Sequence, residues 1–300
     1  MLRTAHVVVP ALLLLSSCAA QEAVHQVATV QFESTPVGKA LKEMRARHGG
    51  ISALRRYAGV EFAYHAHHRD GTIAFDKVAI RFDNSRYLWM RDEADGGTYR
   101  IDLGAAPGGL SPTRLGDGGL VDTLRGKSAA IREPTIDFAL RGLRLLFEPA
   151  LMSAVGRWEF RGLVAPPKYS EDFNPVEVAS KDLYVPEGPY LLETDTDTGL
   201  IARVLYRTDH PSARRRTQKV TFSDYATVSG FRLAHKRRHS RPPLRPAPNI
   251  EANPFRPSPK SIDVLHERID NVRFLTGDEV ERVCPEPDEG SLAEASLSGS

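Results

Sequence analysis

Hydrophobic and polar residues alternate with a period of two in a series of short runs between residues 59 and 274. Val60, Phe62 and Tyr64 alternate with Glu61, Ala63 and His65, which predicts a strand with one buried face. Similar runs, separated mostly by turn residues, follow at 73–82, 86–91, 98–103, 157–163, 182–184, 188–195, 200–206, 217–225, 231–240 and 262–274. The sequence therefore predicts a meander of antiparallel strands.

A few stretches follow a helical period instead. Val37, Leu41 and Met44 predict a helix that starts near Pro36 and stops at Gly49-Gly50. A short helix is expected at 51–57, and a single helical turn at 276–281. The apolar stretch 133–155 predicts a helix that Pro149 kinks or ends, lying over one face of the sheet. The glycine-rich stretch 104–119 and the proline-rich stretch 242–259 are expected to be loops.

The first residues have the pattern of a secretory signal. Arg3 precedes an apolar run, 6–15, which ends in small residues and is too short to span a bilayer. Leu15-Ser16-Ser17-Cys18 resembles the bacterial lipobox. That resemblance implies a signal peptide at 1–17, acyl chains such as palmitate on Cys18, and a tether at 18–33. Ala19 favours an outer-membrane lipoprotein facing the periplasm; the alternative is an ordinary signal cleaved after Ala20.

The composition bears on nucleic-acid binding, domain organisation and cysteine-based metal sites. The chain has 300 residues, 41% of them hydrophobic and 26% charged, with a formal net charge of +2, so no global field favours nucleic acid. Residues 34–283 are expected to form one domain, and the acidic stretch 284–300 a disordered tail. Only Cys18 and Cys284 are present, which excludes a zinc ribbon or an iron–sulfur site. A disulfide between these two is the alternative to acylation.

The order of elements resembles the lipoprotein carrier superfamily of LolA and LolB. The likeness rests on His48-Gly49-Gly50 after the first helix, on 86–92 with 98–103, on 191–206 with its Asp195–Leu200 turn, and on 220–233. The resemblance implies an α+β, mostly antiparallel β fold: an open half-barrel with helices covering its concave face. It also implies a cavity for acyl chains.

A candidate set of ligand-binding side chains follows from the apolar helix and the aromatic strand positions. Lining a cavity under the sheet is one interpretation, and ordinary core packing is the other. The candidates are Tyr64, Tyr87, Trp89, Phe138, Leu143, Leu146, Phe147 and Trp158.

Other candidate chemistry has simpler explanations. His65, His67 and His68 can begin a metal site or form an exposed polar strand face. The basic runs 214–216 and 236–238 can attract anionic headgroups or protect edge strands. Asp195 and Asp197 fit a hairpin turn better than a calcium loop. No G-x-S-x-G is present, and the acidic neighbours of Cys284 disfavour a nucleophilic thiolate.

The sequence thus predicts no enzyme, no cofactor and no resident metal. The first hypothesis is an outer-membrane lipoprotein that binds a lipid or acyl chain. The second is an interaction lipoprotein that docks an envelope partner through a sheet edge. The third is an envelope hydrolase, which requires a buried polar cluster of Asp, Glu or His in a cleft.

Overall fold

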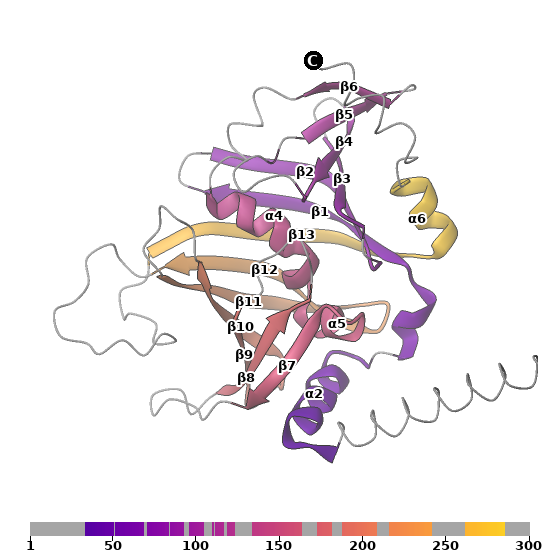
Figure 1. Ribbon diagram of the computed structural model, residues 1–300. Coiled ribbons are helices and arrows are strands. Elements are labelled where there is room, and N and C mark those ends of the chain that lie inside the picture. The colour runs from indigo at the N-terminus through magenta and orange to yellow at the C-terminus, as the bar shows by residue number, and fades with distance from the viewer. Residues whose placement is uncertain are drawn as a thin grey trace, which may run out of the picture. The chain divides into compact units, whose positions relative to one another are not determined.

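The computed structural model describes residues 34–50, 52–68, 71–83, 85–92, 96–104, 110, 112–116, 119–123, 134–163, 173–181, 188–208, 216–241 and 262–285 (Figure 1). The predicted leader, Cys18, the tether, the strand at 182–184, the loop 242–259 and the tail beyond residue 285 lie outside these ranges. The chain divides between Glu43 and Met44 into two compact units.

The division falls within helix α2, Pro36–Arg47. Within the first unit, the Thr35 hydroxyl accepts a hydrogen bond from the Gly38 N–H at 3.0 Å, which caps the start of this helix.

The described strands of the second unit form a single antiparallel sheet. The strand order is β6-β5-β4-β3-β2-β1-β13-β12-β11-β10-β9-β8-β7. The strands are β1 Gly59–His68, β2 Gly71–Arg81, β3 Tyr87–Arg91, β4 Thr98–Asp102, β5 Pro112–Gly116, β6 Gly119–Thr123, β7 Trp158–Leu163, β8 Phe173–Ser180, β9 Tyr190–Asp195, β10 Ile201–Thr208, β11 Arg216–Val228, β12 Phe231–Arg241 and β13 Ile262–Leu275.

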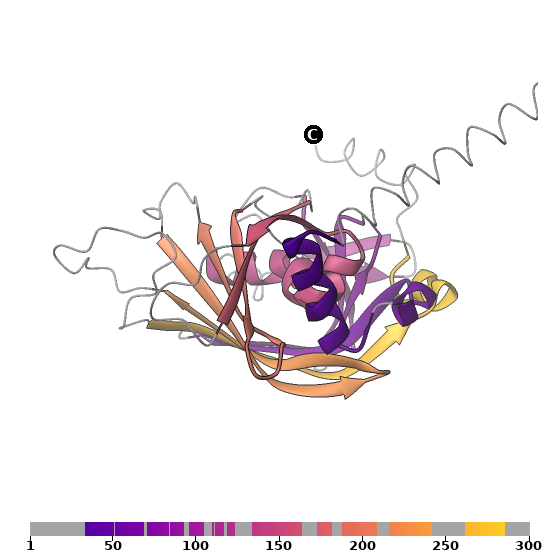
Figure 2. The ribbon, with the colours of Figure 1, turned by 90° about the horizontal axis from the view of Figure 1, so that it is seen from below.

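Two meanders, β1–β6 and β7–β13, meet where β1 pairs with β13. This order leaves β6 and β7 at opposite edges of the described sheet. The connection between them contains α4, Pro134–Leu146, and α5, Pro149–Ala154. It must therefore pass from one edge of the sheet to the other, and Figures 1 and 2 show both helices on one side of the central strands. Phe147, between the two helices, stacks on Phe62 of β1 with ring centroids 4.8 Å apart.

The two faces of the sheet carry different helices. Directly opposite residues of antiparallel strands point to the same face, and successive residues alternate. Phe62 lies opposite Val78, and Val78 opposite Met90, so these three share the face that α4 and α5 cover, called here the α4 face. Trp89 and Ala79 lie opposite each other on the other face. They pack with Val280 of α6, Gly277–Val283, so this is the α6 face.

The helical elements follow the predicted signals. The short helix η1 spans Ser52–Arg56, and the apolar stretch breaks into α4 and α5 ahead of Pro149. Thr276 and Glu279 form a reciprocal capping box at the start of α6. The described side chains from residue 139 to 153 are all buried, so α4 and α5 are enclosed over this stretch rather than half-exposed.

One sequence-based expectation was wrong, and one strand was missed. The stretch 104–119, predicted to be a loop, contains β5 and the first residue of β6. Strand β8 was not predicted at all. Backbone pairing of β5 with β4 and of β8 with β9 stabilises these segments, and a local pattern does not reveal such pairing.

Candidate functional site

Four polar side chains meet on the α4 face of the central strands, in a group named here the Glu267 cluster: Tyr64, Arg237, His239 and Glu267. Each is exposed by 4% or less. The strand register explains the meeting, because Glu267 on β13 lies opposite Arg237 on β12 and Ala66 on β1. Tyr64, two residues before Ala66, points to the same face.

Glu267 is the acceptor at the centre of this cluster. The Tyr64 hydroxyl donates to its Oε1 at 2.6 Å, and His239 Nε2 lies 2.5 Å from its Oε2. Burial pushes the pKa of Glu267 upward, but His239, Arg237 and the Tyr64 hydrogen bond outweigh burial and leave that pKa below its ordinary value. Burial, followed by Glu267, raises the pKa of Tyr64. The pair is therefore a carboxylate and a protonated phenol.

Arg237 is far less completely bonded. Its Nη2 donates to the Phe147 carbonyl oxygen, whereas Nε and Nη1 have no hydrogen-bond partner among the residues that the structure describes. The rings of Phe147 and Phe222 each lie with their centroids 5.7 Å from the guanidinium carbon. Burial lowers the pKa of Arg237, while Glu267 and Glu148 oppose that effect.

A second buried pair joins the α4–α5 junction to the end of α2. His48 Nδ1 lies 3.3 Å from Glu148 Oε1 and 3.0 Å from the Arg232 carbonyl oxygen. The Ile201 N–H donates to His48 Nε2 at 3.2 Å, so the ring proton lies on Nδ1. Burial raises the pKa of Glu148, although His48, Arg237 and the backbone N–H of Ala234 act in the opposite direction.

Gly49 allows the chain to place His48 in this way. Its φ is +104°, and a Cβ there would collide with the Gly230 carbonyl oxygen. The close approach also lets the Arg232 N–H donate to the His48 carbonyl at 3.0 Å. The His48-Gly49-Gly50 motif therefore packs the end of α2 against the β11–β12 turn.

An aromatic row leads from the β7 edge toward the Glu267 cluster. Trp158 and Tyr190 meet edge to face with centroids 5.1 Å apart, and Tyr190 lies 6.0 Å from Tyr206. Burial raises the pKa of Tyr206, with Tyr190 and Glu267 as further contributors. Trp158 Nε1 is buried and has no acceptor in the described part of the chain. The α4 face thus combines aromatic surface with a few buried polar groups.

The sequence-predicted ligand-binding residues fall into two groups. Tyr64, Leu143, Leu146, Phe147 and Trp158 are all buried, and Tyr64 and Phe147 belong to the contacts just described. Whether they contact a ligand stays a prediction. The side chain of Phe138 lies outside the described ones, as does Cys18.

Tyr87 and Trp89 do not join this group, contrary to the expectation that they share one volume with Tyr64. They belong to a core cluster with Leu275, Val280 and Cys284 on the α6 face. The predicted alternation along β3 is correct, but both of its faces are buried. Alternation alone therefore did not reveal which face each aromatic side chain occupies.

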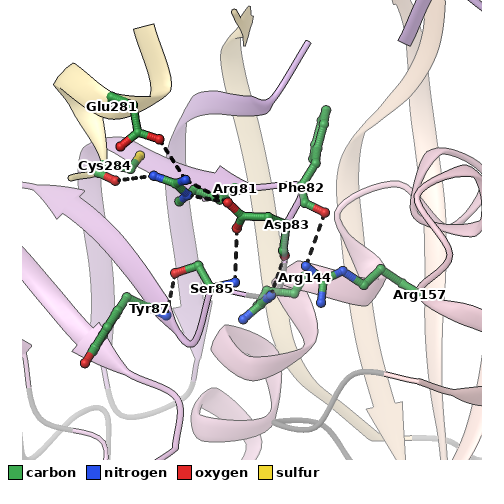
Figure 3. A network of polar contacts seen from close by, with 9 residues as sticks. All are labelled: Arg81, Phe82, Asp83, Ser85, Tyr87, Arg144, Arg157, Glu281 and Cys284. Atoms are coloured by element: carbon green, nitrogen blue, oxygen red, sulfur yellow. Dashed lines mark hydrogen bonds and ion pairs between the residues drawn. The ribbon is translucent and has the colours of Figure 1, made fainter. Parts of the chain in front are cut away.

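Beside that core, Arg81 fastens α6 to the end of β2 through contacts named here the α6 clasp (Figure 3). Its Nε donates to Asp83 Oδ2 at 2.8 Å, its Nη1 to the Cys284 carbonyl at 3.0 Å, and its Nη2 to Glu281 Oε1 at 2.8 Å. Arg144 of α4 donates to the Asp83 carbonyl at 3.1 Å. One turn therefore connects α6 with α4.

The histidine cluster and the Asp195 turn have ordinary structural contacts, and the basic run 214–216 lies outside the side chains that the structure describes. Among the described residues, no three His, Cys, Asp or Glu side chains are grouped so as to hold a metal ion. His67 instead contacts the Thr72 hydroxyl at 3.0 Å. The Asp195 carboxylate accepts from the N–H and hydroxyl of Thr198 at 2.8 Å each, as a hairpin turn requires.

The basic run 236–238 does not protect an edge strand, because β12 lies in the interior of the sheet. Lys236 pairs with Asp224 at 2.9 Å and Arg238 with Asp263 at 3.7 Å, whereas Arg237 between them is buried. The run is thus split between two faces of one strand. Its exposed charges are paired locally, which weakens the headgroup interpretation.

Sequence reasoning missed Arg237, His239 and Glu267, although one signal was available. Glu267 stands between Leu265 and Ile269 at positions of the same parity, so a carboxylate occupies the buried face of a strand. The hydrolase hypothesis required a buried polar cluster, and this is one. The hypothesis also required a cleft, and these four side chains are each exposed by 4% or less.

The chain was compared with family models, curated proteins and solved structures. No family model matches the chain, and no curated protein matches it. Solved structures do. The chain is similar to a DUF1329 family protein from Desulfovibrio piger, at 12% identity over 86% of this chain and 100% of that one, with a TM-score of 0.43. It is also similar to a LolA superfamily protein from Nitrosomonas europaea (9% identity, 79% and 94% covered, TM-score 0.41).

A further similar structure is a putative outer membrane lipoprotein-sorting protein domain from Vibrio parahaemolyticus, with 9% identity, 86% and 97% covered, and a TM-score of 0.40. No helix in the described part of the chain is long and apolar enough to cross a membrane.

Proposed function

We propose that this chain is a cell-envelope lipoprotein that binds a lipid or other acyl chain between its sheet and the α4–α5 segment. In this proposal, α4 and α5 cover the concave face of an open half-barrel, and Cys18 carries the acyl anchor in the outer membrane. The protein takes part in lipid or lipoprotein handling and carries no catalytic machinery.

One observation supports the proposal above the others. The α4–α5 connection crosses an antiparallel sheet whose covered face bears the aromatic row of Trp158, Tyr190 and Tyr206. Removing an acyl chain from water onto such a surface gains about 0.8 kcal/mol for each buried methylene. Since α4 and α5 belong to no strand pairing, they can shift without breaking the sheet.

The test is mass spectrometry of the full chain isolated from bacterial membranes. We expect an acylated N-terminal peptide starting at Cys18, and in addition about one solvent-extractable acyl lipid per chain. Solvent extraction separates the two readouts because it leaves covalent acyl groups in place. An unmodified N-terminus would remove the anchor, and a lipid-free extract would remove the binding function.

A second candidate is an interaction lipoprotein. It is favoured by the edge strand β7, whose Leu163 is the one large hydrophobic side chain found exposed in the described part, at 49%. This candidate predicts a stoichiometric protein partner in the same preparation and no extractable lipid. The experiment above therefore separates the two.

A further inference from the structure

The guanidinium of Arg237 offers hydrogen bonds that the protein itself does not use. The side chain is 2% exposed, and only Nη2 has an acceptor, the Phe147 carbonyl. Nε and Nη1 have none among the described residues. A buried donor left without an acceptor costs about 1–3 kcal/mol. A ligand that supplies an acceptor at this position would remove that cost.

Neither nearby carboxylate satisfies these donors. Both oxygens of Glu267 are bonded to Tyr64 and His239. Glu148 accepts the Ala234 N–H through Oε2 at 3.3 Å, and its Oε1 lies 3.3 Å from His48 Nδ1 without a hydrogen-bond partner among the described residues. Neither carboxylate bonds to Arg237, yet Glu267 lies opposite it in the strand register. The charge of Arg237 is therefore compensated while its donors are not.

This combination favours one class of ligand head. An anionic head would have to lose its hydration completely in this buried site, beside a carboxylate, Glu267, that Arg237 and His239 already offset. A neutral carbonyl oxygen satisfies the free N–H groups without adding charge. The rings of Phe147 and Phe222 flank the guanidinium, so the rest of the ligand meets apolar surface.

We propose that Arg237 recognises the ester carbonyl of a neutral acyl ester, and that the ligand of this protein is such an ester rather than a free fatty acid. The inference rests on the proposed lipid-binding function and adds the identity of the ligand's head. Because Phe147 covers Arg237 in this structure, entry of the ester displaces the α4–α5 junction locally.

The test compares three fluorescent probes on the delipidated full chain: methyl parinarate, cis-parinaric acid, and the hydrocarbon diphenylhexatriene, which has no acceptor. We expect the ester to bind at least about tenfold more tightly than the acid in the unsubstituted protein. In Arg237→Met, ester affinity falls by about tenfold while hydrocarbon affinity is unchanged. Arg232→Met, an exposed position on the same strand, serves as the matched control and leaves all three affinities unchanged.

The outcomes separate the inference from the function. Equal or tighter binding of the acid by the unsubstituted protein overturns the ester assignment, as does an Arg237→Met variant that keeps full ester affinity. If none of the three probes binds, the proposed function itself fails. If circular dichroism shows that Arg237→Met does not fold, the relative affinities of ester and acid in the unsubstituted protein still test the ester assignment.

Discussion

Two arginines on opposite faces of one sheet are used in different ways. Arg81, on the α6 face, has an oxygen partner for each of its three nitrogens, and these partners are the α6 clasp (Figure 3). Arg237, on the α4 face, has a partner for one nitrogen and none for the other two among the described residues. The side chain of Arg81 is partly exposed to solvent, whereas that of Arg237 is buried.

This difference in bonding distinguishes a side chain that holds two elements together from one whose donors are available to a ligand. A side chain that only holds two elements together gains most when all its donors are satisfied, as those of Arg81 are. A buried side chain with free donors costs stability in the free protein and recovers it only with a ligand. The donors of Arg81 are therefore satisfied within the protein, and under our proposal a ligand completes the bonding of Arg237 on the α4 face.

The largest effect is expected from removing the charge that compensates Arg237. Glu267→Ala leaves Arg237 buried without its opposing charge, and should lower the free energy of unfolding by about 3–5 kcal/mol. Urea denaturation at neutral pH measures the change. Asp270→Ala on the same strand removes a partly exposed partner of Arg268 and should cost at most about 1 kcal/mol. If both variants lose equally little, the Glu267 cluster does not matter for stability.

A smaller effect is expected on the α6 face. Arg81→Ala removes the α6 clasp and should cost about 1–3 kcal/mol. It should also expose Cys284, a thiol that is fully buried and whose pKa burial raises to about 12. In a Cys18→Ser background, where Cys284 is the remaining thiol, its reaction with a disulfide reagent should accelerate.

The matched control for Arg81→Ala is Arg282→Ala, which removes an arginine at an exposed position of α6. Its thiol should react as slowly as that of the parent protein. Equal rates in the Arg81→Ala and Arg282→Ala variants would show that α6 is held by its apolar contacts rather than by the clasp.

The smallest effect concerns the pH dependence of Glu148. Burial raises its pKa in the folded protein, so the folded state holds this proton more tightly than the unfolded state does. Its favourable contribution is present below the ordinary glutamate pKa and is lost as the pH rises through the folded value. Glu148→Gln keeps an acceptor for the Ala234 N–H but cannot ionise.

The free energy of unfolding of the variant should therefore match that of the parent protein near pH 4 and exceed it near pH 8. Paired urea titrations across this range measure the difference. A gap that shrinks as the pH rises would mean that Glu148 is stabilised as a carboxylate by His48 and Arg237.

Much of the fold could be predicted because its strands carry a clear alternation, as in Val60, Phe62 and Tyr64. Strand β8 escaped because Pro175 argues against a strand. Among the described residues, its pairing with β7 ends at Val176, one residue short of Pro175. Strand β5 escaped because its pattern lies within a glycine-rich stretch.

The site could be predicted only in part. Alternation placed Tyr64 and Trp89 on buried faces, but it cannot say that these are opposite faces of one sheet. That knowledge requires the registers of β1 with β2 and of β2 with β3, which alternation within one strand does not give. Arg237 was not recognised within a basic run, because its inward direction depends on the pairing of β12 with β13.

The most direct test of the central claim is lipid analysis of the folded full chain after gentle isolation from native membranes. The account predicts about one extractable acyl ester per chain, retained through purification and lost on unfolding in urea. A chain that is folded, acylated at Cys18 and free of any extractable lipid would contradict it.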